Sequence, residues 1–244
     1  MEELIRLSKL LSQRGICSRR EADDYIEKGW IYVEGECITT LGTKVSPNAN
    51  ITLKKELCKI QQNKVTILLN KPLGYVSCLP EDGHYPAIDL ITRENQDSYF
   101  SKAPLKPFHL SKLSVAGRLD INSKGLLVFT QCGAIAKQLI GEDSNIEKEY
   151  FVRISGVLTD EKRALLEHGL SLDDQPLKRA IVRPITAQTF NITLLQGKKR
   201  QIRRMCELVD LDAIELKRVR IGKILLGKLA IGQWRFLEPY ESFI

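Results

Sequence analysis

The run from Lys54 to Lys64 is polar, rich in lysine and weakly periodic, whereas clear hydrophobic patterns occupy the sequence on both sides of it. Domain boundaries usually fall in such exposed polar segments, so we interpret this run as a linker. It divides the 244 residues into a small module, residues 1–62, and a larger domain, residues 63–244. Both lengths suit independently folded units.

The first module reads as a compact α+β unit. Leucines recur at helical spacing within Leu7–Gly15, which predicts a short helix ending at the glycine. Ser18 followed three residues later by Glu21 is the pattern of a capping box, in which each residue satisfies the other's backbone amide at a helix start. The apolar run Trp30–Val33 and the following Glu34–Gly35 turn predict a β-hairpin.

The larger domain alternates between strand and helix patterns. Thr159 is a candidate N-cap of one helix, and apolar residues at helical spacing predict two others. The stretch from Pro80 to Lys112 is rich in proline, and we expect a loop there with one short helix around Ile88–Ile91. We therefore predict a mixed, mostly antiparallel α+β sheet domain. The expected strands are residues 65–69, 126–130, 149–154, 190–195, 219–221 and 231–237, and the expected helices include residues 133–140 and 202–209.

Charge is concentrated near the C-terminal end of the sequence. Between Gln196 and Arg235 there are eleven basic and four acidic residues, so this stretch carries an excess equal to the net charge of the whole chain, +7. A phosphate-binding surface produces such a cluster, and so does a solvated face with no ligand. Charge alone leaves both interpretations open.

Several other classes of protein are disfavoured. The six cysteines and three histidines are scattered and lack the spacing of a structural zinc site or of a metal hydrolase. No apolar run is long enough to span a bilayer, and the first residues lack the basic start and apolar core of a signal peptide. We therefore expect a cytoplasmic protein with no metal, no cofactor and no membrane partner.

Two segments carry side chains suited to chemistry. In Gly117-Arg118-Leu119-Asp120 a charged pair precedes the apolar run 126–130, and a carboxylate held there needs a cation to stay ionised. The alternative is a purely structural salt bridge within the loop, between Arg118 and Asp120. In residues 196–205 a glycine turn leads into a helix start that is dense in lysine and arginine, which favours an anion ligand over a solvated turn.

These segments resemble motifs of the ribosomal RNA pseudouridine synthase family that includes RsuA, RluB, RluE and RluF. Gly117–Asp120 with the following Gly125-Leu126-Leu127 resembles its catalytic motif. Asn70–Ser77 resembles its N-K-P-x-G-x-x-S segment, Lys148–Tyr150 its K-x-Y strand and Arg200–Met205 its Q-[IVL]-R-R-M motif.

Further similarities extend the resemblance over nearly the whole chain. Residues 1–62 are similar to the S4 RNA-binding domain, with Gly15–Ala22 as its signature. The run Glu147–Tyr150 and the ending Gly232–Arg235 are most similar to the RluF type. One departure follows the catalytic strand, where the family's T-N-D-G is replaced by Thr130–Gly133.

The resemblance implies an isomerase that converts a uridine in structured RNA to pseudouridine without a cofactor. Asp120 would act on a flipped-out nucleotide, either by attacking the ribose C1′ or by abstracting a proton to give a glycal. Arg203 would pair with Asp120, Tyr150 would stack on the base and Ile202 would line the pocket, while Arg118 would fill the space the nucleotide vacates. The implied RNA contacts come from Arg14, Arg19, Arg20, Lys71, Lys198, Lys199, Arg200 and Arg204.

The target and two competing functions remain open at this stage. Large-subunit 23S ribosomal RNA is the leading expectation, and a transfer RNA anticodon-loop uridine is the second. A noncatalytic ribosome-assembly protein would make Asp120 superfluous. A hydrolytic enzyme would need a second carboxylate, which the motif does not contain. We expect a monomer.

Overall fold

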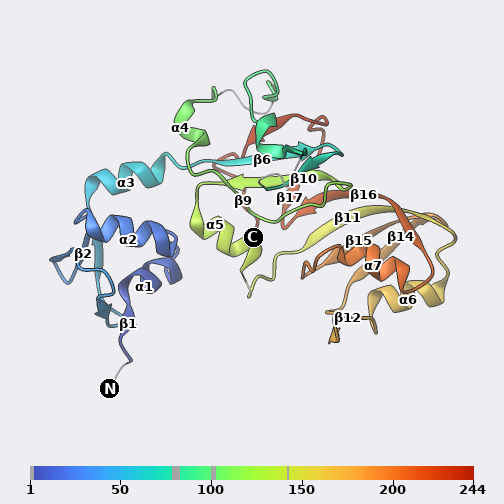
Figure 1. Cartoon of the computed structure of the whole chain (residues 1–244), viewed down its shortest axis with the longest axis horizontal. Coiled ribbons are helices and arrows are strands. Elements are labelled where there is room, and N and C mark those ends of the chain that lie inside the picture. Colours follow the sequence, from blue (N-terminus) through green and yellow to red (C-terminus); the bar gives the residue numbers. More distant parts are fainter. Residues whose placement is uncertain (1–2, 79–82, 100–102, 142) are drawn as a thin grey trace. The chain divides into compact units, whose positions relative to one another are not determined.

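The computed structural model describes residues 3–78, 83–99, 103–141 and 143–244, so parts of the predicted loop after Pro80 lie outside the described residues. The chain forms two compact units (Figure 1). The first comprises Met1–Thr66, Pro107–Ser114 and Thr130–Gln138, and the second comprises the remaining segments, Ile67–Lys106, Val115–Phe129 and Leu139–Ile244. Among the described helices, none is long and apolar enough to cross a membrane.

The first unit contains the predicted helices and hairpin. The capping box is confirmed: the Glu21 amide donates to Ser18 Oγ at 3.2 Å and the Ser18 amide to Glu21 Oε2 at 2.9 Å. A core of leucines from the first helix and Ala22, Tyr25 and Ile26 from the second holds the unit together. Its elements are α1 (Leu7–Gln13), α2 (Arg19–Glu27), α3 (Lys55–Gln62) and α4 (Pro107–Leu110), a sheet of β3 (Glu36–Ile38), β2 (Ile31–Val33) and β5 (Ile51–Leu53), and the pair β1 (Ile5–Arg6) and β4 (Lys44–Val45).

The predicted linker is wrong, because most of it forms the helix α3. Leu57 is fully buried in the core of the first unit, whereas Ile60 is 42% exposed. Only Leu57 of this helix is buried, and its polar, lysine-rich composition favoured the interpretation as a linker. The proposed domain boundary after residue 62 stays a prediction; residues on both sides of it belong to the first unit.

A second helix, α4, lies in the stretch expected to be loop. It depends on a residue distant in the sequence: Gln131 Nε2 donates to the carbonyls of Phe108 and Ser111, both at 2.7 Å. The Gln131 Oε1 atom also accepts from the Val65 amide at 3.0 Å. In this chain Gln131 stands in the family's T-N-D-G segment, and it ties three parts of the first unit together.

The second unit is built on a sheet that has nine strands in the described chain. The main order is β14-β15-β11-β16-β10-β6-β18; β9 pairs with β10 and β17 with β16. The pair β10–β16 is parallel and the other registered pairs are antiparallel, which confirms the predicted mixed, mostly antiparallel α+β fold. The strands are β6 (Thr66–Lys71), β9 (Ser114–Val115), β10 (Lys124–Thr130), β11 (Lys148–Ser155), β14 (Ile181–Thr186), β15 (Thr189–Leu194), β16 (Asp212–Ile221), β17 (Ile224–Leu225) and β18 (Trp234–Phe236).

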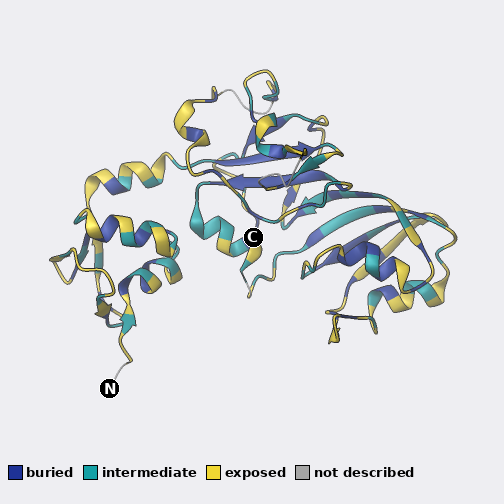
Figure 2. Ribbon diagram, in the orientation of Figure 1, coloured by how far each residue is buried: buried dark blue, intermediate teal, exposed yellow. Residues whose placement is uncertain are grey.

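The helices α6 (Asp160–Glu167) and α7 (Gln201–Glu207) cover one side of the strands β11 and β15. Leu166 of α6 and Ile202 and Met205 of α7 pack with alternate residues of β11 and β15 in one core. Figure 2 shows that β6 and β10 are buried along almost their whole length. The predicted N-cap of α6 is confirmed, because Thr159 Oγ1 accepts from the Lys162 amide. The remaining elements are α5 (Gly133–Ile140), α6 (Asp160–Glu167), α7 (Gln201–Glu207), the 3₁₀ helix η1 (Ala87–Leu90), and the pairs β7 (Tyr75–Val76) with β8 (Tyr85–Pro86) and β12 (Ser171–Leu172) with β13 (Gln175–Pro176).

Candidate active site

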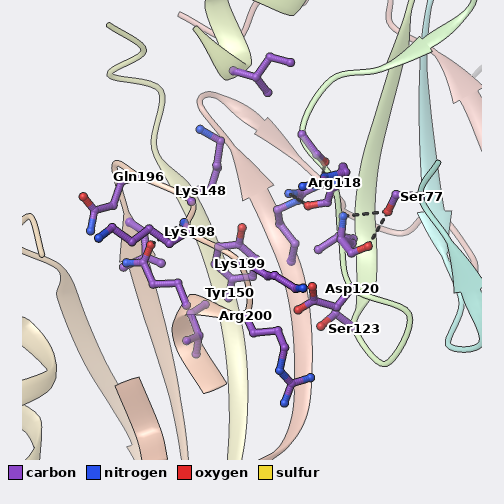
Figure 3. A pocket seen from close by; sticks show the side chains of 18 of the residues that line it. Ser77, Arg118, Asp120, Ser123, Lys148, Tyr150, Gln196, Lys198, Lys199 and Arg200 are labelled. Atoms are coloured by element: carbon purple, nitrogen blue, oxygen red, sulfur yellow. Dashed lines mark hydrogen bonds between the residues drawn. The ribbon is translucent and has the colours of Figure 1, made fainter. Parts of the chain in front are cut away.

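A pocket of about 1220 Å³ opens in the second unit, and the motifs singled out in the sequence meet there (Figure 3). Its lining includes Asp120 from the loop before β10, Tyr150 from β11 and Ile202 from the start of α7. Segments separated by about eighty residues are thus brought to one cavity. Of the RNA-binding candidates, Arg118, Lys198, Lys199 and Arg200 also line it.

The backbone around Asp120 is held from both sides. Ser77 Oγ donates to the Leu119 carbonyl at 2.6 Å and accepts from the Leu119 amide at 2.8 Å (Figure 3). The Gly74 amide donates to the Ile121 carbonyl at 3.0 Å. The residues directly before and after Asp120 are therefore both fixed to the segment that follows β6. This gives the N-K-P-x-G-x-x-S pattern a physical role, which is to position the carboxylate of another motif.

The predicted ion pair between Asp120 and Arg203 is not formed. Arg203 Nη2 donates instead to the Asn122 carbonyl at 2.7 Å and Nη1 to the Ala213 carbonyl at 2.5 Å. Backbone carbonyls of the same loop and of β16 thus take up the guanidinium, and its buried Nε has no hydrogen-bond partner among the described residues. Burial lowers the pKa of Arg203, as does Arg200, while the charge of Asp120 acts in the opposite direction. Asp120 therefore lies close enough to influence Arg203 without contacting it.

The predicted loop salt bridge between Arg118 and Asp120 is also absent. Within the described chain, no lysine or arginine nitrogen lies within 4.0 Å of the half-buried Asp120 carboxylate. The Arg118 side chain is exposed. Both groups therefore remain available to a ligand that enters the pocket.

Lys71 requires a correction, because it is fully buried and cannot reach an RNA phosphate. Its ammonium group donates to the carbonyls of Pro72 at 2.9 Å and Tyr75 at 2.8 Å, which shapes the turn that carries Gly74. Desolvation lowers the pKa of Lys71 to about 8; the Asp120 charge raises it and the Arg218 charge lowers it further. Lys71 is therefore a buried cation near the loop that carries Asp120.

Tyr150 lies between the pocket and the protein core. It is half-buried, packs against the core cluster of the second unit and contributes to the pocket wall. The guanidinium of Arg218 lies 6.0 Å from the centroid of its ring, within the range of a cation–π contact. Ile202 is 4% exposed and joins the same cluster, so it belongs to both the core and the pocket wall.

The basic residues before and within α7 differ in their hydrogen-bond and ion-pair contacts. Lys198 Nζ donates to the Leu172 carbonyl at 2.7 Å, and Arg204 makes two contacts to Asp173, at 2.6 and 3.1 Å. The side chains of Lys199 and Arg200 are exposed and have no hydrogen-bond or ion-pair partner among the described residues. Of the basic residues 198–204, these two are the best placed to receive a phosphate.

Arg218 was not among the predicted site residues, and its charge was counted only as part of the basic C-terminal stretch. This side chain is 1% exposed, and Arg203 and Arg235 are also buried, so the basic stretch is not a continuous surface. One signal was present: Leu216 and Arg218 lie two residues apart on a strand and therefore share a face. The burial of Leu216 places Arg218 inward.

The candidate RNA-binding arginines of the first unit lie on its surface. Arg19 and Arg20 are exposed in the first turn of α2. Arg14 is exposed as well, and its Nη2 donates to the Pro47 carbonyl at 2.9 Å. Their contact with RNA stays a prediction.

Two known protein families match the chain. The family model for RNA pseudouridylate synthase matches residues 65–208, and the S4 domain model matches residues 5–51. The chain belongs to the RNA pseudouridylate synthase family. As a pseudouridine synthase it is an RNA-modifying isomerase, and the S4 match confirms the predicted RNA-binding fold of the N-terminal module.

Curated relatives cover most of the chain. It is 34% identical over 96% of its length to the dual-specificity RNA pseudouridine synthase RluF of Escherichia coli, covering 75% of that protein. It is 29% identical over 97% of its length to ribosomal large subunit pseudouridine synthase B of Bacillus subtilis, covering 93% of it. A solved pseudouridylate synthase with 22% identity superposes with a TM-score of 0.64 over 96% of both chains and shows the same fold.

We predict that Lys71→Met removes a rise in stability between about pH 8 and pH 10.5. In this window the unfolded chain holds a proton on Lys71 that the folded protein has lost, so the free energy of unfolding of the wild type increases with pH. At about 1.4 kcal/mol for each pKa unit, the gain relative to the variant is at most about 3 kcal/mol. Urea denaturation across this pH range measures it.

The exposed Lys228 supplies the matched control, since Lys228→Met should leave the pH dependence of the wild type in place. A difference between the wild type and Lys71→Met that stays flat or falls with pH would contradict the buried-cation assignment.

Proposed function

We propose that this pseudouridine synthase isomerises one uridine of 23S ribosomal RNA and that Asp120 is the carboxylate that acts on it. The observation that carries the proposal is the anchored loop, in which Leu119 and Ile121 are both hydrogen-bonded to the segment 74–77. Holding the backbone on either side of a reactive group limits its motion relative to a bound nucleotide, which is how enzymes lower the entropic part of a barrier.

The pocket is large enough for a whole flipped-out nucleotide, because ligand pockets usually span about 300–1,000 Å³ and this one reaches about 1220 Å³. A uridine stacked in RNA must leave its neighbours before its glycosidic bond is accessible. Arg118 is exposed and unpaired among the described residues, and its planar guanidinium can stack on bases or bind phosphate at the vacated position.

The reaction breaks the bond between ribose C1′ and uracil N1 and forms a bond between C1′ and C5. Asp120 either attacks C1′ directly or takes a ribose proton to leave a glycal; in both routes the detached uracil turns so that C5 faces C1′. The hydrogen on C5 then leaves as a proton and N1 gains one, so no oxidant or cofactor is needed. Tyr150 would stack on the base and can relay a proton through its hydroxyl.

Two buried cations, Lys71 and Arg203, lie near Asp120 without contacting it. The charge of Asp120 opposes the lowering of the pKa that burial causes in both cations. A carboxylate stabilised by longer-range attraction keeps its oxygens free for the substrate. We therefore propose that Arg203 acts on Asp120 through its charge and through its bond to the Asn122 carbonyl.

The RNA backbone would be held at the rim of the pocket and by the S4 domain. Lys199 and Arg200 are the exposed rim cations, whereas Lys198 and Arg204 have partners within the protein. Structured RNA is recognised largely through its shape and phosphates, which suits the dispersed arginines Arg14, Arg19 and Arg20. We expect the enzyme to act as a monomer in the cytoplasm, where ribosomal RNA is assembled.

A transfer RNA uridine is the second candidate substrate. The RluF relatives are named as dual-specificity RNA pseudouridine synthases, which leaves room for a second RNA target beside ribosomal RNA. The names of the B-type relatives refer to the large ribosomal subunit alone. A noncatalytic assembly role is less favoured, since it would give no reason for the fixed backbone around Asp120.

We predict that one or more pseudouridines vanish from 23S ribosomal RNA when the gene is deleted and return with the wild-type protein but not with Asp120→Asn. Asparagine keeps the size of the side chain but can neither attack as a carboxylate nor accept a proton. Site-resolved pseudouridine mapping of total RNA detects these sites and includes transfer RNA in the same experiment.

The control is Asp174→Asn, which removes an exposed carboxylate outside the pocket and should restore the modification. A map unchanged by deletion overturns the proposed function. Restoration by Asp120→Asn overturns the role of Asp120 alone, and loss confined to transfer RNA selects the second substrate.

We also predict that replacing Lys199 and Arg200 together by alanine weakens RNA binding and flattens its salt dependence. Each lost phosphate contact lowers the slope of log Kd against log salt by about 1, so the double variant should lose about 2. Filter binding from low to moderate salt measures this slope. Lys228→Ala, at an exposed lysine outside the pocket, is the control, and a double variant with the wild-type slope would contradict the rim assignment.

A further inference from the structure

Arg218 is a buried cation without a counterion. It is 1% exposed, and no carboxylate of the described chain lies within 4.0 Å of its guanidinium. Burying an unpaired charge is costly, and backbone carbonyls offset only part of that cost. Arg235 shows the ordinary solution in the same unit: it is 7% exposed and bound to Glu241 at 2.6 and 2.8 Å. Arg218, like Lys71 and Arg203, is held by backbone carbonyls in place of a carboxylate, and its burial therefore calls for a role other than stabilising the fold.

The contacts of Arg218 converge on the catalytic loop. Nη2 donates to the Gly117 carbonyl at 2.9 Å, Nη1 to the Arg118 carbonyl at 3.4 Å and Nε to the Leu126 carbonyl at 2.7 Å. Three different nitrogens thus reach both ends of the segment that contains Asp120. The hydrogen bonds of Ser77 and Gly74 fix the middle of that segment, and Arg218 fixes its ends.

The same side chain also contacts the strand that carries Tyr150. In the sheet, Arg218 is the register partner of Gly125 on β10 and of Tyr150 on β11, with a bulge between Glu149 and Tyr150. Its guanidinium lies 6.0 Å from the Tyr150 ring centroid and forms part of the pocket wall. One residue therefore touches both the loop of the proposed carboxylate and the proposed stacking ring.

Gly125 leaves room for this arrangement. Its φ of +105° is in the region that favours glycine, and a Cβ built there would lie 2.3 Å from the Arg218 carbonyl oxygen. Any side chain at this position would push β10 away from Arg218. The glycine that follows the catalytic aspartate in the sequence motif is thus required by the backbone of Arg218.

We propose that Arg218 is a positioning residue, whose guanidinium holds the Asp120 loop and the Tyr150 ring at the separation that the reaction needs. This inference rests on the proposed function, because it assigns Asp120 and Tyr150 their roles. Lysine cannot replace the arginine: its donors all lie on one nitrogen, whereas the three carbonyls are reached by three separate nitrogens of the guanidinium.

The test is steady-state kinetics of Arg218→Lys on an RNA substrate identified by the mapping above. A displacement of about 1 Å in a reacting group can lower a rate about 100-fold, so we expect kcat to fall about 10- to 100-fold. KM and the Kd for RNA should stay within about threefold of the wild type, because Arg218 is only 1% exposed and the cations proposed to bind phosphate are unchanged. A purely structural role would lower the melting temperature without changing kcat of the folded protein.

Two further variants separate position from stability. Arg235→Lys disturbs a buried arginine outside the pocket and should lower the melting temperature while leaving kcat unchanged. Arg218→Ala leaves a space shaped for guanidinium, so millimolar guanidinium chloride should restore part of its kcat, and equimolar sodium chloride should not.

The outcomes distinguish the two proposals. A wild-type protein that forms no pseudouridine overturns the proposed function and this inference with it. An active wild type together with Arg218→Lys at a kcat within about threefold overturns the inference alone. If Arg218→Lys does not fold, Arg218→Gln is measured in its place; failure of both to fold makes the residue structural and also overturns the inference.

Discussion

The backbone hydrogen bonds between residues 74–77 and residues 119–121 are the constraint on which the site depends. Ser77 satisfies both polar groups of Leu119, and the Gly74 amide satisfies the Ile121 carbonyl, so Asp120 lies between two fixed points. Lys71 in turn holds the turn that carries Gly74. The carboxylate is positioned by the main chain, which leaves its oxygens available for a substrate.

The basic residues around this loop form a buried group and an exposed group. Lys71, Arg203 and Arg218 are all buried, and each donates mainly to backbone carbonyls of the loops and strands that form the site. Each cation therefore both fixes the backbone and contributes positive potential near one half-buried carboxylate. The exposed cations Lys199 and Arg200 occupy the rim of the same pocket. The interior basic residues hold the backbone around Asp120, and the outer ones are suited to binding phosphate.

Local patterns made much of the fold predictable. The capping box at Ser18, the hairpin turn at Glu34–Gly35 and the strand 126–130 depend on neighbours in the sequence, and all three are confirmed. The helices α3 and α4 were missed because they depend on distant contacts, Leu57 in the core and Gln131 against Phe108 and Ser111. The resemblance correctly predicted that Asp120, Tyr150 and Ile202 belong to one pocket. The hydrogen-bond partners of Lys71, Arg203 and Arg218 could not be predicted. A charged residue is expected at the surface until its neighbours in the fold are known.

The most direct test of the account is to follow the fate of uracil C5 in RNA labelled with tritium at that position. Moving the attachment of the base from N1 to C5 expels the C5 hydrogen, so the account predicts one tritium released for each pseudouridine formed by the purified protein and none with Asp120→Asn. Pseudouridine and released tritium should remain equal at every time point, with no free uracil. Free uracil without tritium release would contradict the account and identify the chain as a hydrolase.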